Sequence, residues 1–334
     1  MSKKKNLLVV IVNYGYDQIP YLNDMIVALR GFKKYNVKII VNSNIPLDNP
    51  EIDKLNLFEK LEGFGFQDIF FKLKISKKWS GRLYDFNFLP MTCRKSIMDE
   101  IDEHDYFIYS ENDHLWLEHH VDKFIEYEKI LPENRIAGLI QYEFNESGRY
   151  YPGFHSYFDW DYNSIEIYDE KVFAHFNNVH QACFLISKKQ LKKICGMHDF
   201  TNFMSIKNKY SIKCKVNTDI YEDCGFRKLI CVSDFEENII HHIPNLYIDG
   251  SGSRKNLKSS SEERMKSAVQ KILSSALELF TQKKKNWKVI AVPIWVKNSP
   301  THTSCRVSPI STFLSIEKSF HVNLCLQIHK IAIF

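Results

Sequence analysis

The most constraining feature of this sequence is a continuous apolar run near its start. Leu7 to Val12 are all apolar, and the run breaks into the turn Asn13-Tyr14-Gly15-Tyr16. Such a run is typical of a strand buried on both faces of a parallel sheet. Apolar residues then recur with helical spacing between Tyr21 and Lys34, and Val37 to Val41 form a second short apolar run. This order predicts the βαβ unit of a parallel sheet covered by helices.

A pair of carboxylates follows a later apolar run. Tyr106 to Tyr109 are apolar, and the run stops at Ser110-Glu111-Asn112-Asp113. In open α/β sheets the ligand crevice lies outside the carboxyl ends of the strands. Glu111 and Asp113 could meet one hard cation there, such as Mn²⁺ or Mg²⁺. The alternative is a simple turn in which Asp113 caps the helix predicted over His114 to Leu131.

The remaining segments extend the same pattern of strands and helices. Further strands are predicted over Ile69 to Leu73, Ile136 to Tyr142, Gln181 to Ile186 and Glu237 to Ile248. Further helices are predicted over Pro90 to Ile101, Lys188 to Ile194 and Met265 to Phe280. Ser187 would cap the second of these helices. Asp219 to Leu229 is predicted to be a loop that enters a helix. The fold class expected is therefore α/β.

Charge and linker composition divide the chain in two. Residues 251 to 334 hold fourteen Lys and Arg against four Glu and no Asp, although the whole chain has a net charge of only +5. Gly250 to Ser261 is rich in glycine and serine, as linkers are. We therefore expect a domain over residues 1 to 250 and a linker with a basic extension over residues 251 to 334.

The termini and cysteines indicate the cellular setting. The apolar run after Met1-Ser2-Lys3-Lys4-Lys5 is too short for a signal peptide or a membrane span. The eight cysteines form no CxxC pair, so a thiolate zinc site is not expected. We expect a cytoplasmic protein with free thiols. The basic tail favours peripheral contact with the cytoplasmic face of a membrane. A solvated lysine-rich end would explain the basic residues equally well. No nucleic-acid partner is expected.

The run from Asp105 to Asp113 resembles the strand and Asp-x-Asp signature of GT-A glycosyltransferases, with Glu111 in place of the first Asp. The order of the later segments is similar to that of inverting family-2-like nucleotide-sugar glycosyltransferases. The resemblance implies a GT-A (Rossmann-like) fold, with a mostly parallel sheet flanked by helices and a helical basic tail. It also implies transfer of a sugar from a nucleotide-diphosphate sugar to a hydroxyl of a glycan or glycoconjugate. The donor expected first is a UDP-sugar.

The same resemblance assigns roles around the reacting centre. Asp219 to Arg227 looks like the Glu-Asp motif of inverting members, which makes Asp223 the general base, with Glu222 beside it. An acidic helix start is the alternative for this pair. A histidine of Ile239 to Pro244 would complete the metal site formed by Glu111 and Asp113. On a strand His241 and His242 point to opposite faces, so only one can be a ligand, and a buried hydrogen-bonded histidine is the alternative.

The resemblance also predicts nucleotide contacts, all within the first 112 residues of the chain. They fall on six residues: Val12, Asn13, Tyr14, Asn42, Arg94 and Asn112. Asn42-Ser43-Asn44 stands where the family commonly has an acidic residue after the second strand.

Two other functions are compatible with the residues. One is a metal-dependent hydrolase built on Asp113, His114, His119, His120, His241 and His242, although no HExxH spacing is present. The other is a carbohydrate-binding or scaffold protein without catalytic activity on a decayed GT-A fold.

Overall fold

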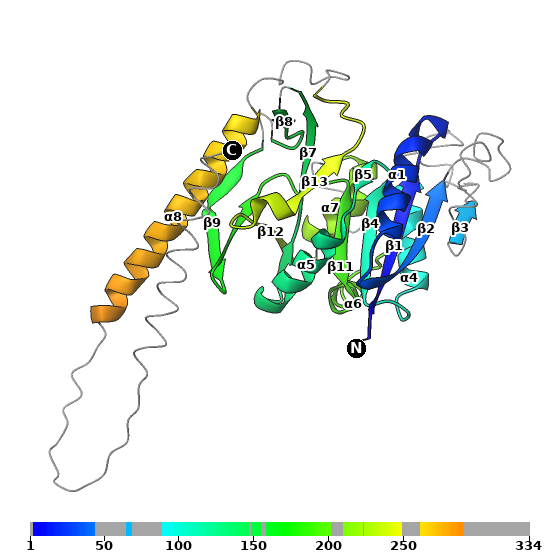
Figure 1. Ribbon diagram of the computed structural model, residues 1–334. Coiled ribbons are helices and arrows are strands. Elements are labelled where there is room, and N and C mark those ends of the chain that lie inside the picture. Colours follow the sequence, from blue (N-terminus) through cyan, green and yellow to red (C-terminus); the bar gives the residue numbers. More distant parts are fainter. Residues whose placement is uncertain are drawn as a thin grey trace, which may run out of the picture.

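The computed structural model has mixed α/β architecture (Figure 1). It describes residues 3–43, 65–68, 89–146, 148–154, 158–201, 210–222, 224–248 and 261–289. The strand predicted over Ile69 to Leu73 and the basic tail beyond residue 289 lie outside these ranges, so both stay predictions. Within the described ranges no helix is long and apolar enough to cross a membrane.

A five-stranded sheet of described strands carries the N-terminal half. Its strands, in spatial order, are β11 (Cys183–Ser187), β4 (Tyr106–Glu111), β1 (Lys5–Asn13), β2 (Tyr35–Ser43) and β3 (Gly65–Asp68). The first four strands along the chain are parallel, as predicted, but β11 runs antiparallel to β4. The expectation of a mostly parallel fold is therefore corrected to one of mixed sheets.

The central strand β1 confirms the prediction made from the apolar run. Leu7 to Val12 are fully buried, because β2 pairs along one edge of β1 and β4 along the other. The register aligns Asn13 with Ser43 and Val12 with Glu111. The carboxyl ends of these three strands therefore lie side by side.

Helices pack around this sheet. The described ones in this part are α1 (Ile19–Arg30), α4 (Leu89–Asp99), α5 (Glu118–Ile130), α6 (Lys188–Cys195) and α7 (Ile212–Glu222), with a short 3-10 helix η1 (Tyr16–Gln18) before α1. The cap predicted for α6 is confirmed. Ser187 Oγ accepts from the backbone N–H of Gln190 at 3.3 Å, and Gln190 Oε1 accepts from the N–H of Ser187 at 3.0 Å.

Two smaller mixed sheets form the rest of the body. One contains β6 (Arg135–Ala137), β12 (Arg227–Cys231), β10 (Lys171–Phe176) and β9 (Trp160–Tyr168). The other contains β5 (His114–Leu115), β13 (Ile239–His242), β7 (Ile140–Asn145) and β8 (Gly148–Tyr150). Both combine parallel and antiparallel pairs.

Three sequence-based predictions of elements are wrong in part, and a fourth, the strand expected over Glu237 to Ile248, is shortened to β13 (Ile239–His242). The helix expected from His114 begins at Glu118, because His114 pairs with His242 in a sheet. The strand expected over Ile136 to Tyr142 is two strands, β6 and β7, in different sheets. The segment from Asp219 to Leu229 is the end of helix α7 followed by strand β12. In each case a partner distant in the sequence overrides the local pattern.

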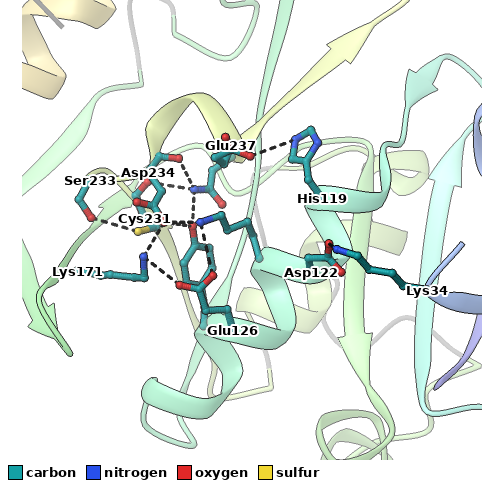
Figure 2. Close-up of polar contacts among 12 residues, drawn as sticks. Lys34, His119, Asp122, Glu126, Lys171, Cys231, Ser233, Asp234 and Glu237 are labelled. Atoms are coloured by element: carbon teal, nitrogen blue, oxygen red, sulfur yellow. Dashed lines mark hydrogen bonds and ion pairs between the residues drawn. The ribbon is translucent and has the colours of Figure 1, made fainter. Parts of the chain in front are cut away.

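A network of charges joins α5 to the segment before β13 (Figure 2). Asp234 Oδ2 accepts from Lys123 Nζ at 2.9 Å, from Lys171 Nζ at 2.7 Å and from Tyr127 Oη at 3.1 Å. Burial alone would raise the pKa of Asp234, but the two lysines outweigh burial and lower the pKa. Asn238, the last residue of the 3-10 helix η3 (Phe235–Asn238), donates to Tyr127 Oη at 3.0 Å. The network therefore fixes the point at which β13 begins.

The last described helix, α8 (Ser261–Val289), belongs to the folded body (Figure 1). Its residues with helical spacing are buried in one cluster with β9 and β10: Met265, Ala268, Val269, Ile272, Leu273 and Ala276. Ser261 Oγ accepts from the backbone N–H of Tyr151 at 2.8 Å. The predicted boundary near residue 250 lies outside the described residues and stays a prediction about the domains.

We expect a chain that ends at residue 248 to lose most of its stability, whereas a chain that ends at residue 282 keeps it. Burial of Met265, Val269, Ile272 and Leu273 contributes on the order of 6 kcal/mol, comparable with the whole stability of many domains. Solubility and urea unfolding of the two truncated chains measure the difference. Equal unfolding midpoints in both would show that α8 is dispensable.

A buried lysine lies between two of the sheets. Lys228 of β12 is 1% exposed, and its Nζ donates to Gln181 Oε1 at 2.9 Å and to the carbonyl of Val179 at 3.2 Å. A Cβ on Gly138 would lie 2.5 Å from Lys228 Cδ, so a larger residue at position 138 would displace the lysine side chain. Burial lowers the pKa of Lys228 to about 7.

This lowered pKa predicts a dependence of stability on pH. Between pH 7 and 10.5, the ordinary pKa of lysine, the unfolded chain holds a proton on Lys228 that the folded chain lacks. The free energy of unfolding therefore increases with pH in this range. We expect the unfolding free energy of wild type relative to Lys228→Met to rise by up to about 1.4 kcal/mol per pH unit from pH 7 to 9. Urea unfolding at several pH values measures it.

Lys171→Met provides the control, because Asp234 and Glu126 outweigh burial and raise the pKa of Lys171. Its difference from wild type should stay constant from pH 7 to 9. Parallel pH curves for wild type and Lys228→Met would contradict a neutral buried lysine.

Candidate functional site

The carboxyl ends of β1 and β4 meet where the strand order reverses. Along the chain, β1 is followed by β2 and β3 on one side, and β4 then pairs on the other side of β1 (Figure 1). Crevices that bind ligands in open α/β sheets lie at such a switch point, outside the carboxyl ends of the strands. The predicted residues Asn13, Glu111, Asn112 and Asp113 all lie at this edge.

Asn112 and Asn13 fix the backbone of this edge. Asn112 Nδ2 donates to Asn13 Oδ1 at 2.8 Å and to the carbonyl of Gln18 at 3.1 Å. Asn13 Nδ2 donates in turn to Ser43 Oγ at 3.1 Å. Gly15 has a φ of 73°, which glycine adopts without strain. The two amides therefore tie together the ends of three strands and the turn that carries Tyr14.

Tyr14 lies beside the carboxylate at the end of β4. Burial, and next the charge of Glu111, raise the pKa of the Tyr14 hydroxyl. Its Oη is buried and has no hydrogen-bond partner among the described residues. Tyr14 is therefore the predicted nucleotide contact whose polar group is available for a ligand.

Three other predicted nucleotide contacts are buried in the core. Val12 is fully buried in β1, and Asn42 Nδ2 donates to Thr92 Oγ1 at 2.7 Å. Arg94 is fully buried, and its Nη2 donates to the carbonyls of Val216 at 2.8 Å and of Lys215 at 2.9 Å. Asn42 and Arg94 join α4 to β2 and to α7, so their observed contacts are structural.

Asp113 and His242, two of the predicted metal ligands, lie in contact. Asp113 Oδ2 is 3.1 Å from His242 Nε2, and His242 Nδ1 is 2.6 Å from Glu143 Oε1. Burial alone would lower the pKa of His242, but the two carboxylates outweigh burial and raise it to about 9. Burial would raise the pKa of Asp113, but His114 and His242 hold it well below its usual range.

The other oxygen of this carboxylate faces His114. Asp113 Oδ1 and His114 Nδ1 are 2.7 Å apart, an ion pair between two buried atoms that are not aligned as a hydrogen bond. Asp113 is therefore contacted by a different histidine on each of its two oxygens.

The structure decides between the two adjacent histidines. His241 Nε2 lies 3.2 Å from Asn245 Oδ1, and its ring stacks on Tyr142 at 5.2 Å between centroids. His242 points the other way, toward Asp113. His242 is therefore the histidine of this pair that contacts Asp113, and its role as the metal ligand stays a prediction.

The other predicted catalytic and metal residues are less well placed by the structure. Glu111 ends β4, and its backbone N–H donates to the carbonyl of Ala182 at 3.0 Å. Among the described residues no group of three or more His, Cys, Asp or Glu side chains is arranged to hold a metal ion. Glu222 is the last residue of α7, and the general base predicted at Asp223 lies outside the described residues. Glu222 therefore ends a helix and does not begin one.

The histidines proposed for a hydrolase do not converge. His120 Nε2 lies 3.1 Å from the carbonyl of Ile239, and its Nδ1 accepts from the backbone N–H of Leu117. His119 approaches Glu237 at 3.9 Å. Only Asp113, His114 and His242 of the six-residue set lie together.

Glu143 is the residue of this site that the sequence did not suggest. It is fully buried in β7, and its Oε2 accepts from the backbone N–H groups of Tyr247 at 2.9 Å and Ile248 at 2.7 Å. An acidic residue in a strand usually indicates the solvent face. Only the pairing of β7 with β13 reveals it as the partner of His242.

Comparison with known proteins gives similarity of structure at a low level. No family model matches the chain, and no curated protein matches it. Staphylococcus aureus TarS is similar with a TM-score of 0.39 and 11% identity, over 80% of this chain and 64% of that one. A protein from Desulfovibrio desulfuricans, described as a nucleotide-diphospho-sugar transferase, is similar with a TM-score of 0.36 and 10% identity, over 79% and 96%. Similarity at this level assigns neither a family nor an activity.

We expect Glu143→Leu to lower the free energy of unfolding by about 3 to 5 kcal/mol, because it leaves His242 charged, buried and with one partner fewer. Glu143→Gln, which keeps an acceptor, should cost less, about 1 to 2 kcal/mol. Urea unfolding followed by tryptophan fluorescence measures both. The exposed Glu146 is the matched control, and a loss in Glu146→Leu as large as that in Glu143→Leu would refute the role of the buried contact.

Proposed function

We propose that this chain is a glycosyltransferase that moves a sugar from a nucleotide-diphosphate sugar to a hydroxyl of a glycan or glycoconjugate. The observation that carries the proposal is the contact of Asp113 with His242 at the end of β4, with Glu143 fixed behind the imidazole. The paired amides of Asn13 and Asn112 hold the adjoining turn at the switch point, where open α/β sheets bind nucleotides.

Asp113 and His242 fit a divalent cation that binds together with a diphosphate. His242 Nδ1 donates to Glu143, which turns Nε2 of His242 toward Asp113, and the other oxygen of Asp113 faces His114 Nδ1 at 2.7 Å. A carboxylate that orients a ligating histidine in this way is common at metal sites. Mg²⁺ often takes only one or two protein carboxylates and completes its shell with substrate phosphates and water, and Mn²⁺ accepts similar ligands. We assign Asp113 and His242 as ligands, with Glu111 as a further candidate.

The bound cation would neutralise the negative charge that grows on the diphosphate as its bond to the sugar breaks. Asn13 and Asn112 would orient the nucleotide by holding the turn after β1. Tyr14 Oη would donate to the nucleotide, since it has no partner among the described residues. The family resemblance makes a UDP-sugar the first donor to test.

Deprotonation of the acceptor hydroxyl is assigned to Asp223, with Glu222 as its neighbour. Glu222 ends α7, which packs against α4 and β12. A general base there would act as the hydroxyl attacks the sugar. This assignment rests on the sequence motif, and the position of α7 supports it.

We expect UDP and Mn²⁺ together to stabilise the protein in a thermal-shift titration far more than either does alone. Saturation at 100 times the dissociation constant is worth about 2.7 kcal/mol. Asp113→Asn and His242→Gln should each weaken Mn²⁺-dependent UDP binding by at least about tenfold, because each removes a proposed ligand.

His241→Gln is the matched control, since His241 is adjacent in sequence and points away from Asp113. Its UDP affinity should equal that of wild type. Wild-type affinity in Asp113→Asn would overturn the metal assignment. UDP binding without sugar transfer or donor hydrolysis across nucleotide sugars would favour a carbohydrate-binding protein in place of an enzyme.

A further inference from the structure

A thiol, an imidazole and an amide form a second constellation beside the candidate site. Cys214 Sγ lies 3.9 Å from His180 Nε2, and His180 Nδ1 lies 3.2 Å from Asn217 Oδ1. Cys214 and Asn217 are one turn apart on α7, and His180 belongs to the segment between β10 and β11. Cys214 is partly exposed, whereas Asn217 is fully buried.

The hydrogen bonds fix the tautomer of the imidazole. Asn217 Oδ1 also accepts from the backbone N–H of Gln181 at 3.4 Å, so the amide oxygen is the atom that faces His180. An oxygen can only accept, which means that His180 Nδ1 carries the proton and donates it. The lone pair of Nε2 is therefore directed at the Cys214 thiol and can take its proton, as the base does in thiol nucleophile arrangements.

Two further features stabilise the thiolate form of Cys214. Ser211 Oγ donates to Sγ at 3.2 Å. Cys214 also lies in the first turn of α7, where the helix dipole favours negative charge. A nearby imidazole, a hydroxyl donor and a helix N-terminus each lower the pKa of a thiol.

The other thiols of the described residues lie in different surroundings. Cys93 and Cys183 are fully buried, and burial raises the pKa of each. Cys224 is also buried, and its Sγ donates to the carbonyl of Asp219 at 3.5 Å. Burial also raises the pKa of Cys231 to about 11. Cys195 is partly exposed like Cys214, but burial still raises its pKa, and its Sγ contacts Met98 Sδ at 3.5 Å. Cys195 is therefore a matched reference for Cys214 within the same molecule.

We propose that Cys214 is a modification site, an activated thiol that reacts with low-molecular-weight disulfides, with His180 as its base and Asn217 as the residue that positions this base. The Cys214 thiolate attacks one sulfur of the disulfide, and a new S–S bond forms as the old one breaks. The released thiolate takes the proton held by His180. The products are a mixed disulfide on Cys214 and one free small thiol.

An adduct on Cys214 would lie beside the nucleotide contact. Cys214 lies on α7, which packs against α4, and α4 packs in turn against β1 and β4. The charge of a Cys214 thiolate is also among the smaller causes that raise the pKa of Tyr14 and of Tyr109, after burial and Glu111. The mixed disulfide would restrict access to Tyr14 and lower donor binding, a consequence that rests on the proposed function.

The reactivity of Cys214 is tested by limited labelling of the intact protein with iodoacetamide at pH 7, followed by peptide mass spectrometry. We expect Cys214 to react at least about tenfold faster than Cys195, because its thiolate fraction is larger. His180→Gln should reduce the rate at Cys214 to that at Cys195 without changing the melting temperature. Equal rates at the two thiols in wild type, or an unchanged rate in a folded His180→Gln variant, would overturn the proposal.

The positioning role of Asn217 has its own pair of variants. Asn217→Ala should slow labelling of Cys214 severalfold, whereas Asn217→Asp keeps an acceptor for His180 Nδ1 and should preserve the rate. The rate at Cys195 reports any general loosening of the fold. Equal slowing at both cysteines in Asn217→Ala would refute the positioning role.

The effect on the donor site is measured separately. Wild type and Cys214→Ser are treated with oxidised glutathione, and UDP binding with Mn²⁺ is compared before and after. We expect a mixed disulfide on Cys214 and weaker UDP binding in wild type alone. A disulfide on Cys214 with unchanged UDP affinity would refute the effect on the donor site. Absence of UDP binding in untreated protein would refute the proposed function and leave the labelling result to decide on the thiol.

Discussion

The pairing of β1 along both of its edges is the constraint on which the rest of the structure depends. Leu7 to Val12 are fully buried, and β2 and β4 align with β1 residue by residue. The side chains of a strand alternate between the two faces of the sheet. A shift of the pairing by one residue would therefore move every apolar side chain of the strand to the opposite face. The fixed register brings Asn13, Ser43 and Glu111 to one edge of the sheet. The turns after β1 and β4 can then share hydrogen bonds.

The second part of the site depends on charges that are buried together. His242 lies between the carboxylates of Asp113 and Glu143, and Glu143 is held by two backbone N–H groups. A buried imidazole without these partners would lose its proton, whereas here the pKa is raised to about 9. The ion pairs of Asp234 fix the chain just before β13 (Figure 2). The position of His242 is thus set from both ends of its strand.

Helix α7 connects the candidate site with the reactive thiol. Arg94 donates to carbonyls of α7, and Asp219 on the same helix accepts from Lys215 at 2.5 Å. These buried contacts hold the helix against α4, so that its first turn presents Cys214 to His180. Arg94, which was expected to contact the nucleotide, instead fixes the helix that carries Cys214.

The sequence by itself determined the elements whose pattern is local. The buried strand β1, the parallel order of the first strands, the acidic end of β4, the Ser187 cap and the helical face of α8 all follow from periodicity and capping chemistry, which involve residues within one or two turns. It also predicted that His241 and His242 would point to opposite faces of a strand. Only the tertiary structure decided that His242 is the one that contacts Asp113, because that contact joins residues 129 positions apart. The role of Glu143, the antiparallel β11, the end of α7 before Asp223 and the pairing of Cys214 with His180 likewise depend on distant partners. Such contacts are set by the packing of the whole chain, and no local pattern of residues encodes them.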